Sequence, residues 1–141
     1  MFFYFCVSKH LTLSLGKTTD MKYLIDKQEL YTSMSLMEDN LNSLIAPDLK
    51  SEFVMLHTEG AKNFILDLSQ VKFVDSSGLS AILTANRLWK SEQSHFCLTG
   101  ISNPSVKKLI EISKLDTILS ILPTTADAAA FIQKEEVSRE M

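Results

Sequence analysis

The sequence has few of the residues on which disulfide scaffolds, metal sites and motif-bearing enzymes depend. Its 141 residues include two cysteines and three histidines. Two cysteines cannot form a disulfide scaffold, and the histidines share no ligand spacing, so neither a metal nor another cofactor is expected. A Walker-type phosphate loop and the Gly-x-Ser-x-Gly motif of serine hydrolases are also missing from the sequence. Most enzyme classes that sequence motifs identify are therefore disfavoured.

Charge and hydrophobic runs exclude two further kinds of protein. The chain carries 14 Lys and Arg against 17 Asp and Glu, a formal charge of −3, which offers no attraction to nucleic-acid phosphates. The apolar run at residues 1–7 has no cationic lead-in and is interrupted at Lys9, unlike a secretory signal. No window approaches the ~18 apolar residues of a transmembrane helix. We expect a cytoplasmic protein without direct nucleic-acid contact or membrane insertion.

Residues 1–20 differ in pattern from the rest of the chain. Ordered periodicity begins at Met21, which favours Met21 as the natural start and residues 1–20 as an N-terminal extension upstream of it. The alternative is a short extra strand within residues 11–15, where apolar and polar residues alternate. The sequence leaves both interpretations open.

From Met21 onward, β-prone segments alternate with helical patterns. The expected strands are residues 23–25, 30–37, 63–68, 95–99 and 118–122, the first two forming a hairpin. Apolar residues at spacings of three and four predict helices over residues 41–56, 79–89, 103–112 and 126–134. Ser43 is the expected N-cap of the first helix, and Gly60 is placed to end that helix or the loop after it.

This alternation predicts an α/β fold for one domain over residues 21–134, followed by a polar tail over residues 135–141. A mixed β-sheet of about four to five strands with about four helices is expected. The apolar strand at residues 63–68 is typical of a parallel sheet that helices cover. Cys97, which lies between apolar neighbours in a strand pattern, is expected to be buried.

One short motif, Asp75-Ser76-Ser77-Gly78-Leu79, stands where a strand passes into a helix. Backbone N–H groups and the helix dipole make a phosphate group tolerable at such a position. A phosphorylated serine there would gain roughly −1.5 to −2 charge without melting the helix, which suits a switch that a partner reads. Asp and Ser are also preferred N-cap residues, so helix capping alone is sufficient to explain the tetrapeptide.

The wider segment resembles a known family. Residues 63–83 read NFILDLSQVKFVDSSGLSAIL. This closely resembles the central segment of STAS domains, the family of bacterial anti-sigma factor antagonists. In that pattern an apolar strand and Asp-Leu lead through a short connection to Asp-Ser-Ser/Thr-Gly-Leu at a helix start. The resemblance continues into residues 106–116 and extends more weakly from Met21 to about Ile132, so that only residues 1–20 fall outside it.

The resemblance implies a partner-switching protein that is not itself an enzyme. In the family, the serine directly after the motif Asp is phosphorylated by an anti-sigma factor that is also a serine kinase, and that position here is Ser76. The unphosphorylated protein binds the anti-sigma factor, the phosphorylated protein releases it, and a phosphatase can reset the switch. Asp75, Ser77, Gly78 and Leu79 are implied to lie at the partner-binding surface.

One departure from the family pattern concerns the turn before the first helix. Many members carry Gly-x-Leu-Asp there, with the acidic residue near the phosphorylation site. The corresponding stretch, residues 38–43, lacks the glycine and has Asn42 where the acid is expected. Asn42 and Ser43 are still expected at the partner-binding surface, with Asn42 able to cap the helix but not to supply the charge.

A second interpretation keeps the fold and changes the role. STAS proteins also occur as subunits of transporter ATPase complexes and in larger signalling assemblies, where Ser76 would contact a partner without phosphate turnover. An enzyme with Ser76 or Ser77 as its nucleophile is disfavoured, because the sequence has no hydrolase elbow motif with a positioned histidine.

Overall fold

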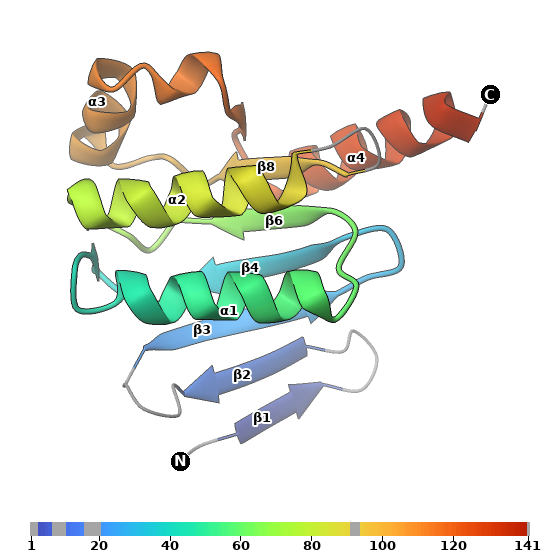
Figure 1. Ribbon diagram of the computed structural model, residues 1–141, viewed down its shortest axis with the longest axis horizontal. Helices are drawn as coiled ribbons and strands as arrows, with labels where there is room; N and C mark the ends of the chain where they lie inside the picture. The colour runs from blue at the N-terminus through green and yellow to red at the C-terminus, as the bar shows by residue number, and fades with distance from the viewer. Residues whose placement is uncertain (1–2, 7–10, 16–20, 91–93, 141) are drawn as a thin grey trace.

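A mixed β-sheet forms the centre of the protein, and helices cover both of its faces (Figure 1). The computed structural model describes residues 3–6, 11–15, 21–90 and 94–140. Within these residues the main sheet has the strand order β1-β2-β3-β4-β6-β8-β9. The bounds of its strands are β1 Phe3–Cys6, β2 Leu11–Leu15, β3 Lys22–Lys27, β4 Thr32–Leu36, β6 Phe64–Asp67, β8 Phe96–Thr99 and β9 Ser120–Leu122.

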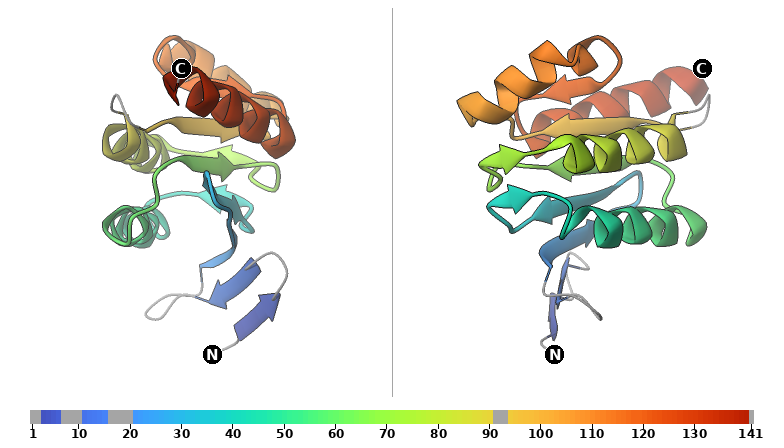
Figure 2. Two further views of the ribbon diagram at one scale, coloured as in Figure 1. Left: turned by 90° about the vertical axis from the view of Figure 1, so that its right-hand side faces the viewer. Right: turned by 60° about the vertical axis from the view of Figure 1, so that its left-hand side comes forward.

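Two layers of helices flank this sheet. The helices α1 (Ala46–Thr58) and α2 (Ser76–Trp89) lie side by side on one face, and α4 (Thr125–Glu140) lies on the other (Figure 2). The helix α3 (Pro104–Ile112) packs through Val106 and Ile110 into the same core as α1 and α2. The five strands from β3 to β9 in the main sheet, with these four helices, confirm the predicted α/β class.

Strand direction in the sheet follows the lengths of the connections. The strands β3 and β4 are antiparallel and form the predicted hairpin, whereas β4, β6, β8 and β9 are parallel and joined through helices. The strand β2 occupies residues 11–15, where alternation predicts an extra strand, and pairs antiparallel with β3. Residues 1–2, 7–10 and 16–20 of the predicted extension lie outside the described residues, and Met21 as the natural start stays a prediction.

Alternation along β6 divides the core between the two faces of the sheet. Phe64 and Leu66 join the large cluster under α1 and α2, whereas Ile65 packs with Ala128 and Ile132 of α4. All five side chains have no exposed surface. A strand that is apolar at every position is therefore required here, because both of its faces are covered.

Aromatic rings fill the end of this core beneath the C-terminal turn of α2. The Trp89 ring stacks on Phe64 with centroids 4.3 Å apart, and Phe53 meets Phe64 edge-on at 5.4 Å. The Trp89 indole nitrogen donates a 2.8 Å hydrogen bond to the Ala61 carbonyl, so the buried polar atom is satisfied. These contacts attach α1 and α2 to the sheet.

The thiol of Cys97 is buried in β8, as predicted. Burial raises the pKa of this thiol to about 12. A thiol with so high a pKa is almost entirely protonated at neutral pH, so it is a poor nucleophile and acts as a small apolar side chain.

The first helix begins later than the periodicity predicts, and its predicted cap was wrong. Helix α1 starts at Ala46 with Ile45 at the N-cap position and no side-chain cap, so Ser43 does not cap it. Leu41 belongs to the short strand β5 (Asn40–Leu41) and not to the helix. Its spacing from the later apolar residues resembles a helical repeat because β5 buries Leu41 in the same core.

The last helix is longer than predicted. Helix α4 runs through Glu140, so residues 135–140 of the predicted polar tail are helical. Tertiary contacts explain the difference: Glu136 is only 6% exposed and forms a 3.0 Å ion pair with Lys62. Its other carboxylate oxygen accepts a 3.0 Å hydrogen bond from the Asn63 side chain. A polar sequence is held as helix here by partners far away in the chain.

Asn63 is the centre of this network. Its side-chain nitrogen donates to the Leu30 carbonyl at 2.7 Å and to Glu136, while its side-chain oxygen accepts from the His95 backbone N–H at 2.8 Å. The Asn63 side chain has no exposed surface. One buried amide therefore joins the β3–β4 turn, the start of β8 and helix α4.

Replacing this amide is expected to be costly. Asn63→Ala should lower the free energy of unfolding by about 3 kcal/mol, because it removes the partners of several buried polar groups. Urea denaturation followed by circular dichroism measures the effect, with the exposed Gln133→Ala on α4 as a control expected to stay within about 0.5 kcal/mol of wild type. A loss below about 1 kcal/mol for Asn63→Ala would contradict the assigned network.

Candidate partner-binding site

The motif lies at the edge of the sheet where the parallel strands end. The loops after β4 and β6 meet there through a two-stranded ribbon, in which β5 pairs parallel with β7 (Phe73–Val74). The Asp39 carbonyl accepts hydrogen bonds from the backbone N–H groups of Lys72 at 2.7 Å and Phe73 at 3.1 Å. This ribbon brings residues 39–45 beside the segment that leads directly into the motif.

Asp75 caps helix α2. Its backbone is extended, with φ −102° and ψ −172°, and its side chain accepts a 2.9 Å hydrogen bond from the Gly78 N–H. Its own N–H donates to the Leu41 carbonyl at 3.2 Å. The capping explanation of the tetrapeptide is thus correct for Asp75, and it leaves both serine hydroxyls free of the capping role.

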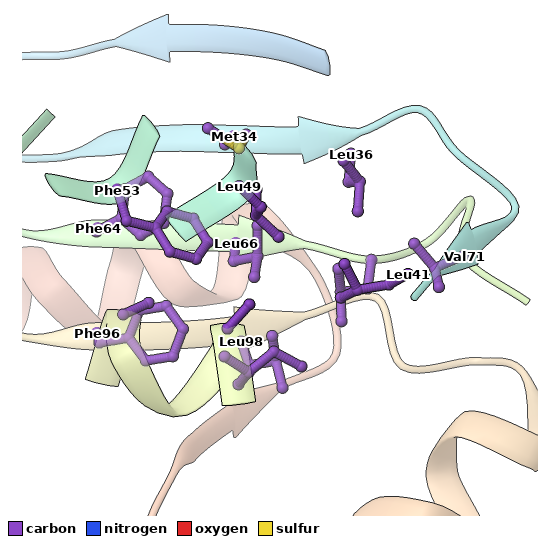
Figure 3. Packing of buried hydrophobic residues seen from close by; sticks show 14 of the residues in the cluster. Met34, Leu36, Leu41, Leu49, Phe53, Phe64, Leu66, Val71, Phe96 and Leu98 are labelled. Atoms are coloured by element: carbon purple, nitrogen blue, oxygen red, sulfur yellow. The ribbon is translucent and has the colours of Figure 1, made fainter. Parts of the chain in front are cut away.

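Gly78 is required by a close approach of backbone. A Cβ atom at this position would lie 2.5 Å from the Leu41 carbonyl oxygen and 2.8 Å from side-chain carbons of Leu41 and Val74. Leu41 has no exposed surface, and Figure 3 shows it beside Val71 at the end of the core nearest the arrowhead of β4. The glycine therefore lets the first turn of α2 sit directly on β5.

The two serines differ in accessibility. Ser76 is the first residue of α2 and is exposed, whereas Ser77 and Leu79 are partly buried. A phosphate on Ser76 would lie at a helix N-terminus, where the dipole favours negative charge by about 0.3–1 kcal/mol. Of the motif hydroxyls, Ser76 is the one that a modifying enzyme can reach most easily.

The predicted loop residues adjoin the motif but do not cap α1. The Asn42 side chain accepts a 3.0 Å hydrogen bond from the Leu44 N–H, and the Asn42 carbonyl accepts from the Ile45 and Ala46 N–H groups. Asn42 thus stabilises the turn that precedes the helix, while Ser43 is exposed on that turn. Both lie at the motif's edge because β5, directly before them, pairs with β7.

Sequence reasoning missed three apolar side chains at this edge. Leu44 is 80% exposed, Phe73 is 51% exposed and Met37 is 38% exposed. Met37 and Leu44 line a shallow hollow of about 490 Å³, together with Asn42 and other residues of the β4–α1 connection. An apolar residue beside a strand is ordinarily expected inside, so only the fold could reveal these side chains at the surface.

The described residues contain no group of three or more His, Cys, Asp or Glu side chains that could hold a metal ion. Within the same residues, no helix has the length and apolar character needed to cross a membrane. The candidate site consists of an exposed serine at a capped helix start, a hydrogen-bonded loop and a group of exposed apolar side chains.

Fold and site together define an α/β domain with a capped, polar helix start at the edge of its sheet, and a comparison with family models identifies its family. The family model of the STAS domain matches residues 23–128 of this chain. The chain belongs to the STAS domain family.

Several proteins that it resembles are described as anti-sigma factor antagonists, and its fold also resembles that of a sulfate transporter family protein from Wolinella succinogenes. BtrV of Bordetella bronchiseptica is provisionally described as an anti-sigma factor antagonist. It is 29% identical to this chain over 115 residues, which cover 79% of this chain and 95% of BtrV. A Thermotoga maritima protein, provisionally so described, has a crystal structure with a TM-score of 0.69 and 24% identity, covering 79% of this chain and 94% of that one. Phosphorylated SpoIIAA of Bacillus has a TM-score of 0.60 and 17% identity, covering 78% of this chain and 98% of SpoIIAA. The two structural similarities show a shared fold.

Proposed function

We propose that this protein is a phosphorylation-controlled partner-switching regulator. With Ser76 unphosphorylated it binds an anti-sigma factor that has serine kinase activity, and with Ser76 phosphorylated it releases that partner. A phosphatase resets the switch. The protein works in the cytoplasm, takes part in transcription regulation and catalyses no reaction of its own, since it is the substrate of the kinase.

The observation that carries the proposal is the position of Ser76. It is exposed at the first residue of α2, and the neighbouring Asp75 already caps that helix through Gly78. A phosphate at this place changes the surface charge by roughly −1.5 to −2 and leaves the cap intact. The modification therefore alters what a partner meets without requiring the domain to unfold.

The relatives support the same role. BtrV is described, provisionally, as an anti-sigma factor antagonist. SpoIIAA has been solved both in an unphosphorylated and in a phosphorylated form, and each form matches this chain with a TM-score of 0.60. A domain of this fold thus accommodates the phosphorylated state.

Phosphorylation provides the direct test. Wild type, Ser76→Ala and Ser77→Ala are incubated with ATP and an extract of the source cell, and modified residues are located by mass spectrometry. We expect phosphate on Ser76 in wild type and in Ser77→Ala, and none on the Ser76→Ala chain. Phosphate confined to other residues would sink the proposal.

Affinity capture then identifies the partner. Immobilised Ser76→Ala should retain a protein that phosphorylates the wild-type chain on Ser76 after purification. If the bait instead retains a transporter ATPase and no kinase modifies Ser76, the chain acts as a subunit of a transport or larger signalling assembly without a phospho-switch.

A further inference from the structure

Exposed apolar side chains gather around the segment that leads to Ser76. Phe73 stands three positions before Ser76, in β7, and pairs in register with Asn40 of β5. Asn40 lines the same hollow as Met37 and Leu44. The hollow of about 490 Å³ and the exposed Phe73 ring therefore adjoin each other across the β5–β7 ribbon. Large exposed apolar groups that cluster in this way mark interaction sites.

The backbone beneath these side chains is held in place. The Asp39 carbonyl accepts backbone hydrogen bonds from Phe73 and from Lys72 before it, and Asn42 holds the turn that carries Leu44. The first turn of α2 rests on Leu41 at Gly78. A surface fixed before binding loses little conformational entropy when a partner docks.

Charges of both signs lie at the rim of this surface. The rim has two carboxylates, from Glu38 and Asp39, and two ammonium groups, from Lys22 and Lys72. The Glu38 carboxylate accepts a 2.8 Å hydrogen bond from the Lys22 backbone N–H, and the Lys72 ammonium lies 4.0 Å from the Asp39 carboxylate, with both side chains 70% exposed. An apolar centre with a polar, solvated rim is the usual anatomy of a protein interface.

We infer that the partner controlled by Ser76 docks an apolar surface on Phe73, Leu44 and Met37, and that phosphorylation ejects it by the cost of desolvating the phosphate. The inference rests on the proposed function and specifies its partner chemistry. Two cations and two carboxylates border the hollow and Phe73, and the further carboxylate beside Ser76, that of Asp75, is held as the cap of α2, so the surface provides no strong field for an acidic or a basic partner. A neutral hydroxyl can be covered by apolar groups, whereas a covered dianion loses its hydration, and the helix dipole offsets only a small part of that cost.

Salt dependence distinguishes this mechanism from repulsion between two acidic surfaces. Repulsion between solvated charges is screened over about 10 Å at 0.1 M salt and about 3 Å at 1 M. A desolvation penalty depends on contact with water and changes little with salt. The two mechanisms therefore predict different behaviour for the same charged variant.

The probe is the kinase captured on Ser76→Ala and purified, and its dissociation constant is measured by titration calorimetry. Binding to wild type and Ser76→Glu is compared at about 0.05 M and about 1 M NaCl. We expect the ratio of the two dissociation constants to change by no more than about threefold between these salts. A ratio that falls toward one at high salt would establish repulsion and overturn the inference.

The apolar anchors are tested by substitution. Leu44→Ser and Phe73→Thr should each weaken binding of the same kinase by about tenfold or more, because buried apolar area is lost. Val137→Ser, on the C-terminal half of α4, is the matched control, since Val137 is 52% exposed against 51% for Phe73. Thermal unfolding verifies that each variant is folded.

The outcomes separate the two proposals. If Ser76→Glu weakens binding of the kinase but Leu44→Ser and Phe73→Thr bind it as tightly as wild type does, the inferred docking surface is wrong. The proposed phospho-switch is then still supported. If Ser76→Glu binds as tightly as wild type at both salts, the proposed function itself fails.

Discussion

Ser76→Glu is expected to lower the affinity of the protein for its kinase partner by about 100-fold or more at physiological salt. The added carboxylate would stand at the exposed start of α2, three residues after Phe73 of the β5–β7 ribbon. Covering an ion in an interface without a counter-charge costs several kcal/mol, and each 1.4 kcal/mol is about a factor of ten in affinity. Calorimetric titration of the purified kinase measures the change.

Two controls separate charge from size and from position. Ser76→Gln adds a side chain of nearly the same length without the charge and should retain affinity within about tenfold of wild type. Ser77→Glu places the charge one residue further along, on a partly buried position. If Ser76→Gln weakens binding as much as Ser76→Glu, the partner senses bulk, and charge is not the signal.

Gly78→Ala is expected to destabilise the domain by about 2–3 kcal/mol, although alanine is the better helix former by about 1 kcal/mol. The added Cβ would meet the Leu41 carbonyl oxygen at 2.5 Å, a distance that cannot be relieved by rotating a side chain. Either α2 or β5 must shift, and both carry the partner-binding site. Packing strain therefore outweighs helix propensity at this position.

Chemical denaturation of Gly78→Ala measures this cost, with Ser80→Ala on the next turn of α2 as the control for helix propensity alone. Ser80→Ala should stay within about 0.5 kcal/mol of wild type. Unchanged or greater stability of Gly78→Ala would show that the helix start does not rest on β5 as described.

Local chemistry made the motif predictable. Asp75 caps a helix because its carboxylate reaches the N–H of a residue three positions later. Such short-range geometry can be predicted from the sequence. The alternation of strands with helices likewise predicts the mixed sheet, because burial on two faces demands an apolar strand such as β6. Neither result needs knowledge of which distant residues meet.

Long-range contacts decided the remainder. Helix α4 continues through residues 135–140 because Glu136 forms an ion pair with Lys62 and a hydrogen bond with Asn63. A polar segment contains no sequence pattern that predicts such distant partners. Leu41 looks helical by its spacing but pairs as β5 with β7. A residue-by-residue pattern cannot distinguish these cases, because burial on a helix and burial on a short strand select the same apolar side chain.

The sequence by itself determined the α/β class and the capped helix start, since the periodicities and the cap depend on neighbours within a few residues, and the resemblance to STAS domains singled out Ser76. Tertiary structure alone decided that Leu44 and Phe73 face solvent near the motif, and it placed Asn42 and Ser43, which the resemblance implied at the partner-binding surface, directly after β5. Both outcomes depend on the β5–β7 ribbon, which joins segments more than thirty residues apart. Pairing over that separation is a property of the folded chain, and the partner-binding surface exists only where it forms.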